Sequence, residues 1–218
     1  MVDELRQALL SRGADLLARV GAGQHQPSGP VVEKLLDAYA EPHRGYHDLR
    51  HLAEVLDHVD LLAAEAAHPD LVRLAAWFHD AVYTASTTAG ADEEASAQLA
   101  ETGLTGLGVA AEDVREVTRL VRLTATHDPA AGDGDGAVLC DADLAVLARD
   151  EAGYAHYVDG VRREYAHVPD AAFRAGRAAV LRSLVSQPRL FRTPTGFARC
   201  ESAARRNVTD ELARIADP

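Results

Sequence analysis

Histidines and carboxylates carry the chemistry of this chain, and they occur in three short groups. The first group, YHDLRH, contains His47 and His51; at this spacing on a helix two imidazoles share a face and can hold one metal ion. In the second group, WFHDAVY, His79 and Asp80 end an apolar run. Neighbours on a helix point about 100° apart, so both side chains can reach one ion only if it lies near a helix end.

The third group, LCDADL, places two carboxylates in an otherwise apolar stretch. Asp141 is the natural cap of the following helix, which leaves Asp143 as a candidate ligand. Burying His79 and Asp80 beside an aromatic pair costs free energy unless a partner such as a metal ion satisfies them. Taken singly, each group also fits a plainer interpretation: two half-exposed histidines, a surface histidine beside a capping aspartate, and a helix cap.

Together the groups form a spaced set of His, His-Asp and Asp, which resembles the motif of the HD superfamily of metal-dependent phosphohydrolases. The matching positions are His51, His79, Asp80 and Asp143, and the resemblance extends over about residues 44–207. YHDLRHL, FHDAVY, EEASA and DADL are similar to an uncharacterised bacterial branch, usually described as a predicted HD phosphohydrolase. The resemblance implies an all-α domain whose four matching side chains bind a divalent metal.

A set of two imidazoles and two carboxylates suits several metals. Mn²⁺, Fe²⁺, Ni²⁺ and Zn²⁺ fit it, Mg²⁺ fits less well, and the sequence does not choose between them or between one ion and two. A metal ion supplies hydroxide from bound water near neutral pH and neutralises charge on a phosphoryl oxygen. The expected function is therefore hydrolysis of a small phosphate ester or nucleotide, with Asp80 as both ligand and catalytic residue.

Four more side chains are candidates around this centre. His47 could contact substrate, support the ligands or bind a second ion. His127 lies where some HD enzymes carry an extra histidine for a second metal, and it is also a candidate for substrate binding; a loop histidine near a helix C-terminus explains it equally well. Glu93 could act as a general acid or base or orient water, although first-turn acids commonly stabilise a helix N-terminus. Arg44 is the best candidate for a contact with phosphate.

Other functions remain open at this point. A dinuclear iron oxygenase also occurs on HD-like folds and would recruit His47 and His127 as extra ligands. A non-catalytic binding module would use the metal only for stability. The HDLRH segment has the spacing of a zinc metalloprotease, but Asp48 stands where that motif needs the longer glutamate.

Composition narrows the class of partner. The chain has 218 residues, 47% of them hydrophobic, and its 22 Lys+Arg against 34 Asp+Glu give a net charge of −12. This acidic balance argues against long nucleic acid as a ligand, because phosphate backbones need clustered cations. Two cysteines, acidic residues near the start and the lack of a long apolar run predict a cytoplasmic protein with no membrane span. The oligomeric state is not predicted.

The sequence predicts that the segments carrying these residues are helices throughout. Apolar residues recur at helical spacing, with Leu52, Val55, Leu56, Val59 and Leu62 as one inward face, and strand-like alternation is scarce. We expect one all-α HD-type domain over residues 1–218, with a motif core of about 44–150 and C-terminal helices of about 151–216 packed on it. The segments 21–30 and 127–136 are predicted to be breaks between helices. The expected helices cover about 5–20, 31–40, 47–67, 69–78, 92–101, 110–126, 139–149, 151–166, 170–187 and 199–216.

Overall fold

The structure is a computed structural model that describes residues 2–22 and 27–216. Within these residues the fold consists of ten α-helices and two short 3-10 helices, without a strand, which confirms the predicted all-α class. None of the described helices is both long enough and apolar enough to cross a membrane.

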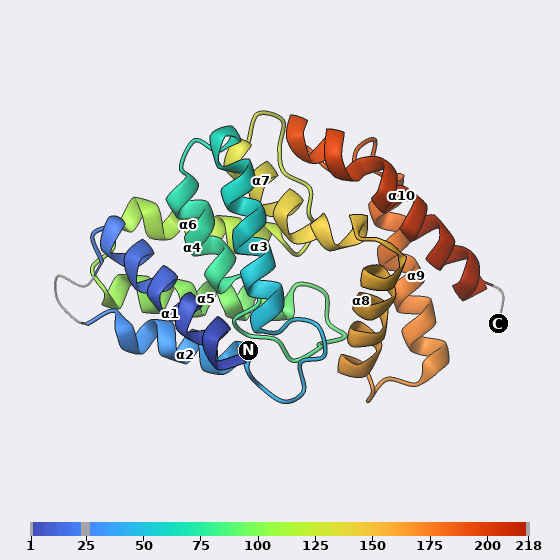
Figure 1. Cartoon of the computed structure of the whole chain (residues 1–218), viewed down its shortest axis with the longest axis horizontal. Coiled ribbons are helices and arrows are strands. Elements are labelled where there is room, and N and C mark those ends of the chain that lie inside the picture. Colours follow the sequence, from blue (N-terminus) through green and yellow to red (C-terminus); the bar gives the residue numbers. More distant parts are fainter. Residues whose placement is uncertain (1, 23–26, 217–218) are drawn as a thin grey trace.

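Figure 1 shows an elongated molecule in which α8, α9 and α10 lie at one end and α1, α2 and α5 at the other, with α3, α4, α6 and α7 between. The bounds of the helices are α1 Val2–Arg19, α2 Gly29–Tyr39, α3 Leu49–Leu62, η1 Ala63–Glu65, α4 Pro69–Phe78, α5 Ala91–Gly106, α6 Ala111–Leu123, α7 Gly134–Leu144, η2 Ala145–Ala148, α8 Glu151–Glu164, α9 Asp170–Ser186 and α10 Pro194–Ala216.

A first hydrophobic cluster is formed by the helices from α1 through α7. The predicted inward face of α3 is buried in this cluster, with every member at most 3% exposed. The largest buried side chains of this cluster are Tyr39 and, at the end of α4, Trp77 and Phe78. Each fully buried side chain of this size contributes about 1.5–3 kcal/mol by leaving water, so this cluster holds the ends of α3, α4 and α7 in fixed positions.

A second hydrophobic cluster joins η2 to α8, α9 and α10. Leu147, Leu181 and Phe191 are buried within it. Tyr46, from the segment between α2 and α3, belongs to this second cluster although its neighbours along the chain belong to the first. The segment before α3 therefore lies where the two clusters meet.

Three helix starts differ from the sequence-based expectation. The helix expected from His47 begins at Leu49, because the Asp48 side chain caps it by accepting hydrogen bonds from the Arg50 and His51 N–H groups. Helix α7 begins at Gly134, inside the predicted 127–136 break, with Asp133 as its cap. Helix α10 begins at Pro194, since proline suits a first turn. Residues 23–26 of the other predicted break, 21–30, lie outside the described residues.

Candidate metal centre

Three helix ends bring the four predicted ligands together. His51 lies in the first turn of α3, and Asp143 lies in the last turn of α7. Helix α4 ends at Phe78, and His79 and Asp80 follow directly. Because this end points at the start of α3, the two adjacent side chains can turn toward the same point, as their spacing required.

The ligand atoms of His51, His79 and Asp80 lie close enough to share one ion, and Asp143 lies beside the two histidines. The Nε2 atoms of His51 and His79 are 3.1 Å apart. Asp80 Oδ2 lies 3.3 Å from the first and 3.2 Å from the second, and His51, His79 and Asp80 form the most compact potential metal-binding group of the described residues. Asp143 Oδ1 lies 3.4 Å from His51 Nε2 and 3.6 Å from His79 Nε2. Two nitrogens at right angles around an ion, each about 2.1 Å from it, would be roughly 3.0 Å apart.

The outer nitrogens of both imidazoles are held by hydrogen bonds, which orients the inner ones. His79 Nδ1 lies 2.8 Å from the Ala76 carbonyl oxygen, which can only accept, so Nδ1 carries the proton. In the neutral ring Nε2 then has a free electron pair. His51 Nδ1 lies 3.1 Å from the Tyr46 hydroxyl, which orients the ring and can either donate to this nitrogen or accept from it. Such partners commonly fix the tautomer of metal-binding histidines.

Burial and charge make this cluster costly without a cation. The side chains of His51 and His79 are 2% and 0% exposed, whereas those of Asp80 and Asp143 are 17% and 16% exposed. The imidazoles are fully buried, whereas the carboxylates keep a small exposed fraction. Burial lowers the pKa of His51, but hydrogen bonds to Asp143 and Asp80 outweigh it and raise this pKa to about 8.

The pKa values of the two carboxylates shift in the opposite direction to that of His51. Burial raises the pKa of Asp80 and of Asp143, but the facing His79 and the hydrogen-bonded histidines outweigh it and hold both pKa values well below the usual range. Two ionised carboxylates therefore face two imidazole nitrogens in a largely buried space. This donor set fits a divalent metal ion, which would replace the protons that the imidazoles otherwise hold.

His127 and Glu93 both lie beside the centre. His127 Nε2 is 2.8 Å from Asp143 Oδ2, the oxygen that faces away from the two ligand histidines. Its backbone is left-handed, with φ at 50°, four residues after the end of α6, and its side chain reaches Asp143 of α7. Burial raises the pKa of Glu93, as do the charges of Asp80 and Asp92, while His127 lowers it. Glu93 therefore lies within electrostatic reach of the centre from the first turn of α5.

His47 lies close to the centre, and its side chain is hydrogen-bonded to Glu164 of α8. It precedes α3, so it does not share a helical face with His51, although their ring centroids are 5.3 Å apart. Its Nδ1 lies 2.8 Å from Glu164 Oε2. Because His47 lies outside α3, the two histidines do not form the helical pair of a zinc metalloprotease.

Arg44 supports the walls of the centre through backbone carbonyls. Its side chain is 0% exposed, and Nη1 donates to the carbonyl oxygens of His47 and Asp80 at 2.9 Å and 2.8 Å. Nη2 donates to the Ala81 carbonyl oxygen, and Nε pairs with Glu41. These contacts hold the segments that carry His47 and Asp80 together. Its role as a phosphate contact stays a prediction.

Two functionally placed carboxylates were not identified from the sequence. Asp141 was assigned to a helix cap, but it lies inside α7 and accepts hydrogen bonds from the Arg192 N–H and from the N–H and hydroxyl of Thr193. Glu164 was not singled out at all. No local signal distinguishes either residue, because their partners lie far away along the chain.

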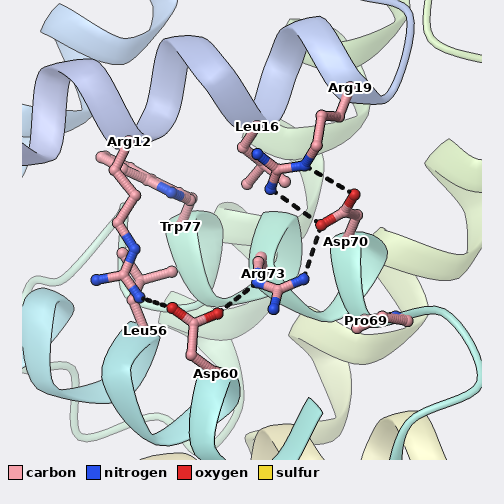
Figure 2. A pocket seen from close by; sticks show the side chains of 9 residues that line it. All are labelled: Arg12, Leu16, Arg19, Leu56, Asp60, Pro69, Asp70, Arg73 and Trp77. Atoms are coloured by element: carbon pink, nitrogen blue, oxygen red, sulfur yellow. Dashed lines mark hydrogen bonds and ion pairs between the residues drawn. The ribbon is translucent and has the colours of Figure 1, made fainter. Parts of the chain in front are cut away.

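The remaining described cavities lie outside the cluster of ligands. Figure 2 shows a pocket of about 470 Å³ between α1, α3 and α4, in which Arg12, Arg19 and Arg73 pair with Asp60 and Asp70. Its arginines are neutralised by these partners, and it lies toward the start of α4 rather than the end that carries the centre. A second cleft, of about 720 Å³, borders Arg44 on the outer side of the segment before α3.

Comparison with protein-family models, with curated proteins and with solved structures finds no match for this chain. The interpretation of the site therefore depends on its own geometry and chemistry.

Proposed function

We propose that this chain is a metal-dependent phosphohydrolase of the HD type that acts on a small phosphate ester or nucleotide in the cytoplasm. The observation that carries the proposal is the convergence of two imidazole nitrogens and two carboxylates from three helix ends. A divalent ion held by His51, His79, Asp80 and Asp143 would lower the pKa of a bound water and neutralise charge on a phosphoryl oxygen.

The surrounding side chains support hydrolysis by what they can do to water and substrate. Glu93, with its raised pKa, is suited to exchange a proton with water at the rim of the centre. His127 holds the outer oxygen of Asp143 and so keeps the inner oxygen turned toward the two ligand histidines. The carboxylates are more exposed than the two buried histidines, so we infer that reactants approach from the carboxylate side.

A second function is favoured by one contact. His127 Nε2 lies 2.8 Å from Asp143 Oδ2, so this carboxylate could bridge two ions, with His127 as a ligand of the second. A two-ion site would serve hydrolysis, and with iron it would also serve an oxygenase. The third interpretation, a binding module, keeps the metal as a purely structural ion.

The test uses the full chain stripped of metal and reloaded in turn with Mn²⁺, Fe²⁺, Ni²⁺, Zn²⁺ or Mg²⁺. Release of inorganic phosphate from a panel of phosphate esters and nucleotides is measured with each ion, together with metal content and, for iron, oxygen consumption. Phosphate release that needs the ion and disappears in Asp143→Asn supports the proposal. Oxygen consumption without phosphate release identifies an oxygenase, and a metal-loaded protein that does neither is a binding module.

A further inference from the structure

Glu164, the last residue of α8, places a fully buried carboxylate against the segment that precedes α3. Its Oε1 accepts hydrogen bonds from three consecutive backbone N–H groups, those of Gly45, Tyr46 and His47, at 2.8, 2.7 and 2.9 Å. Its Oε2 lies 2.8 Å from His47 Nδ1 and accepts a hydrogen bond from the Tyr83 hydroxyl at 3.0 Å. The side chain is 0% exposed, so water does not compete for these contacts.

Two glycines allow this approach. A Cβ on Gly45 would lie 2.5 Å from the Gly160 carbonyl oxygen, and a Cβ on Gly160 would lie 2.8 Å from that of Gly45. The backbones of α8 and of the segment before α3 therefore touch directly, one turn before Glu164. This contact brings the carboxylate within reach of three N–H groups that no helix satisfies.

The carboxylate is ionised in this setting. Burial raises the pKa of Glu164, but the hydrogen bond from His47, its charge and the backbone N–H groups outweigh it and lower this pKa to about 2. An ionised carboxylate accepts hydrogen bonds and donates none. The nitrogen of His47 that faces it must therefore carry a proton.

We propose that Glu164 is a positioning residue that fixes the proton of His47 on Nδ1 and so leaves Nε2 as the accepting nitrogen of the neutral ring beside the metal centre. The ring is also held between its neighbours, with centroids 4.3 Å from Tyr83 and 5.3 Å from His51. The His47 side chain is 20% exposed, whereas that of Glu164 is fully buried. Nε2 then accepts a hydrogen bond from water or a substrate hydroxyl at the rim of the centre.

The consequence for catalysis rests on the proposed function, whereas the tautomer does not. A histidine whose orientation and proton are fixed by a carboxylate presents one defined hydrogen-bonding atom to a reactant. Because Glu164 belongs to the C-terminal helices, this arrangement makes the centre dependent on how α8 packs against the first cluster. It gives these helices a role in the site beyond stability.

The test is long-range ¹H–¹⁵N NMR of protein labelled at the histidine ring nitrogens, without metal and with Zn²⁺. Spectra are recorded at alkaline pH, where the neutral imidazole predominates, and His47→Gln assigns the signals. The proposal expects the Nδ1–H tautomer of His47 in the wild-type chain. A wild-type His47 with its proton on Nε2 overturns the proposal outright, whether or not any variant folds.

Glu164→Gln separates positioning from support of the backbone. The amide oxygen can still accept the three N–H groups, while its NH₂ group takes the place of Oε2 and donates to Nδ1. We expect the proton of His47 to move to Nε2 in this variant, and an unchanged tautomer overturns the proposal. Glu201→Gln is the matched control, because Glu201 is another buried carboxylate that accepts backbone N–H groups, from Leu190 and Phe191 of the second cluster. It should leave the His47 signals unchanged.

An activity measurement then connects the tautomer to the reaction. If the reloaded wild-type chain releases phosphate, Glu164→Gln should lower kcat about 10–100-fold with little change in KM, as expected for loss of a supporting carboxylate. An unchanged kcat despite a moved proton overturns the catalytic consequence. If the wild-type chain releases no phosphate while its tautomer is Nδ1–H, the proposed function fails and the positioning of His47 stands.

Discussion

At the scale of single residues, two aspartates on one turn of α7 have different tasks. Asp143 points its Oδ1 at the two ligand histidines and its Oδ2 at His127. Asp141 instead accepts hydrogen bonds from the backbone of Arg192 and Thr193, ahead of α10. The two side chains differ by two positions, which on a helix turns them to different sides. This pair allows a sharp comparison of metal binding with support of the fold.

We expect Asp143→Asn to weaken binding of a divalent ion by more than about 100-fold, because it removes a charged ligand rather than a supporting group. Asp141→Asn should keep the ion but lower the free energy of unfolding by about 1–3 kcal/mol, since its amide NH₂ would face donors. Metal content after dialysis and denaturant titration measure the two effects. Equal metal loss in both variants would contradict the assignment.

Metal content also distinguishes the proposed HD-type site from a zinc metalloprotease site. A zinc-protease site would lose more metal in His47→Ala than in Asp143→Ala. We expect the reverse order, because His47 precedes α3 and shares no helical face with His51, whereas Asp143 Oδ1 lies 3.4 Å from His51 Nε2. Titration of each variant with Zn²⁺ decides between them.

An ion pair outside the centre predicts how the stability of the fold depends on pH. Asp70, at the start of α4, accepts two hydrogen bonds from Arg19 at 3.0 Å and one from Arg73 at 2.7 Å (Figure 2). The hydrogen bond from Arg19 lowers the pKa of Asp70, with burial opposing it and Arg73 adding to it. A carboxylate whose pKa is lowered by folding stabilises the folded state above its unfolded pKa of about 3.9 and loses this contribution as the pH falls further.

We therefore expect Asp70→Asn to lower the free energy of unfolding by roughly 1 kcal/mol at pH 7, a modest value because the pair is partly exposed. The difference from the wild-type chain should shrink below about pH 4 and also in high salt. Urea titrations at several pH values measure it, with Asp210→Asn on the exposed side of α10 as the control. A difference that grows on acidification would refute the ion-pair explanation.

At the scale of elements, helix ends rather than helix faces build the centre. The start of α3 and the ends of α4 and α7 each supply ligands, and α5 and α6 bring Glu93 and His127 to the rim. Helix α8 holds the segment before α3 through a contact of two glycine backbones and one buried carboxylate. The position of the segment therefore depends on the small size of Gly45 and Gly160.

We expect Gly160→Ala to lower the free energy of unfolding by about 1–3 kcal/mol, because its methyl group would lie 2.8 Å from the Gly45 carbonyl oxygen. Gly176→Ala in α9 is the matched control, since nothing lies within 4 Å of its added Cβ and alanine favours a helix interior; it should stabilise by about 0.5–1 kcal/mol. Thermal and denaturant unfolding measure both changes. Similar effects at the two glycines would contradict the close backbone contact.

At the scale of the whole molecule, the metal centre lies in the region where two hydrophobic clusters meet. Its ligands come from helices of the first cluster, whereas Tyr46, which contacts His51, belongs to the second. An ion bound to the folded centre and not to the unfolded chain stabilises the whole fold by mass action. Metal binding should therefore be visible in global unfolding.

At a free-ion concentration of 100 times Kd, the gain in free energy should be about 2.7 kcal/mol. For a chain of this size this corresponds to a rise in Tm of roughly 5–10 °C, which a chelator should reverse. Differential scanning calorimetry measures the shift, and Asp143→Asn serves as the control. An equal rise in that variant would show that the ion acts elsewhere, at surface carboxylates.

The sequence by itself determined the helical class and indicated four candidate ligands, of which the structure groups His51, His79 and Asp80 closely enough to hold an ion. Helical spacing of apolar residues depends only on local geometry, so the buried face of α3 could be read directly. Residue type and order, together with the resemblance to the HD motif, pointed to His51, His79, Asp80 and Asp143 as candidate ligands. The starts of α7 and α10 were misplaced, since glycine, aspartate and proline there act as first-turn residues and not as breaks.

Only the tertiary structure decided what surrounds these ligands. Glu164 meets His47 across 117 residues, and Asp141 meets Arg192 across 51, so no local pattern marks either carboxylate among the many acids of the chain. The direction of the His47 ring, the engagement of Arg44 with backbone carbonyls and the pairing of His127 with Asp143 are likewise set by packing between distant helices. Residue type limits which bonds a side chain can form, whereas the fold determines which partner is near enough to form them.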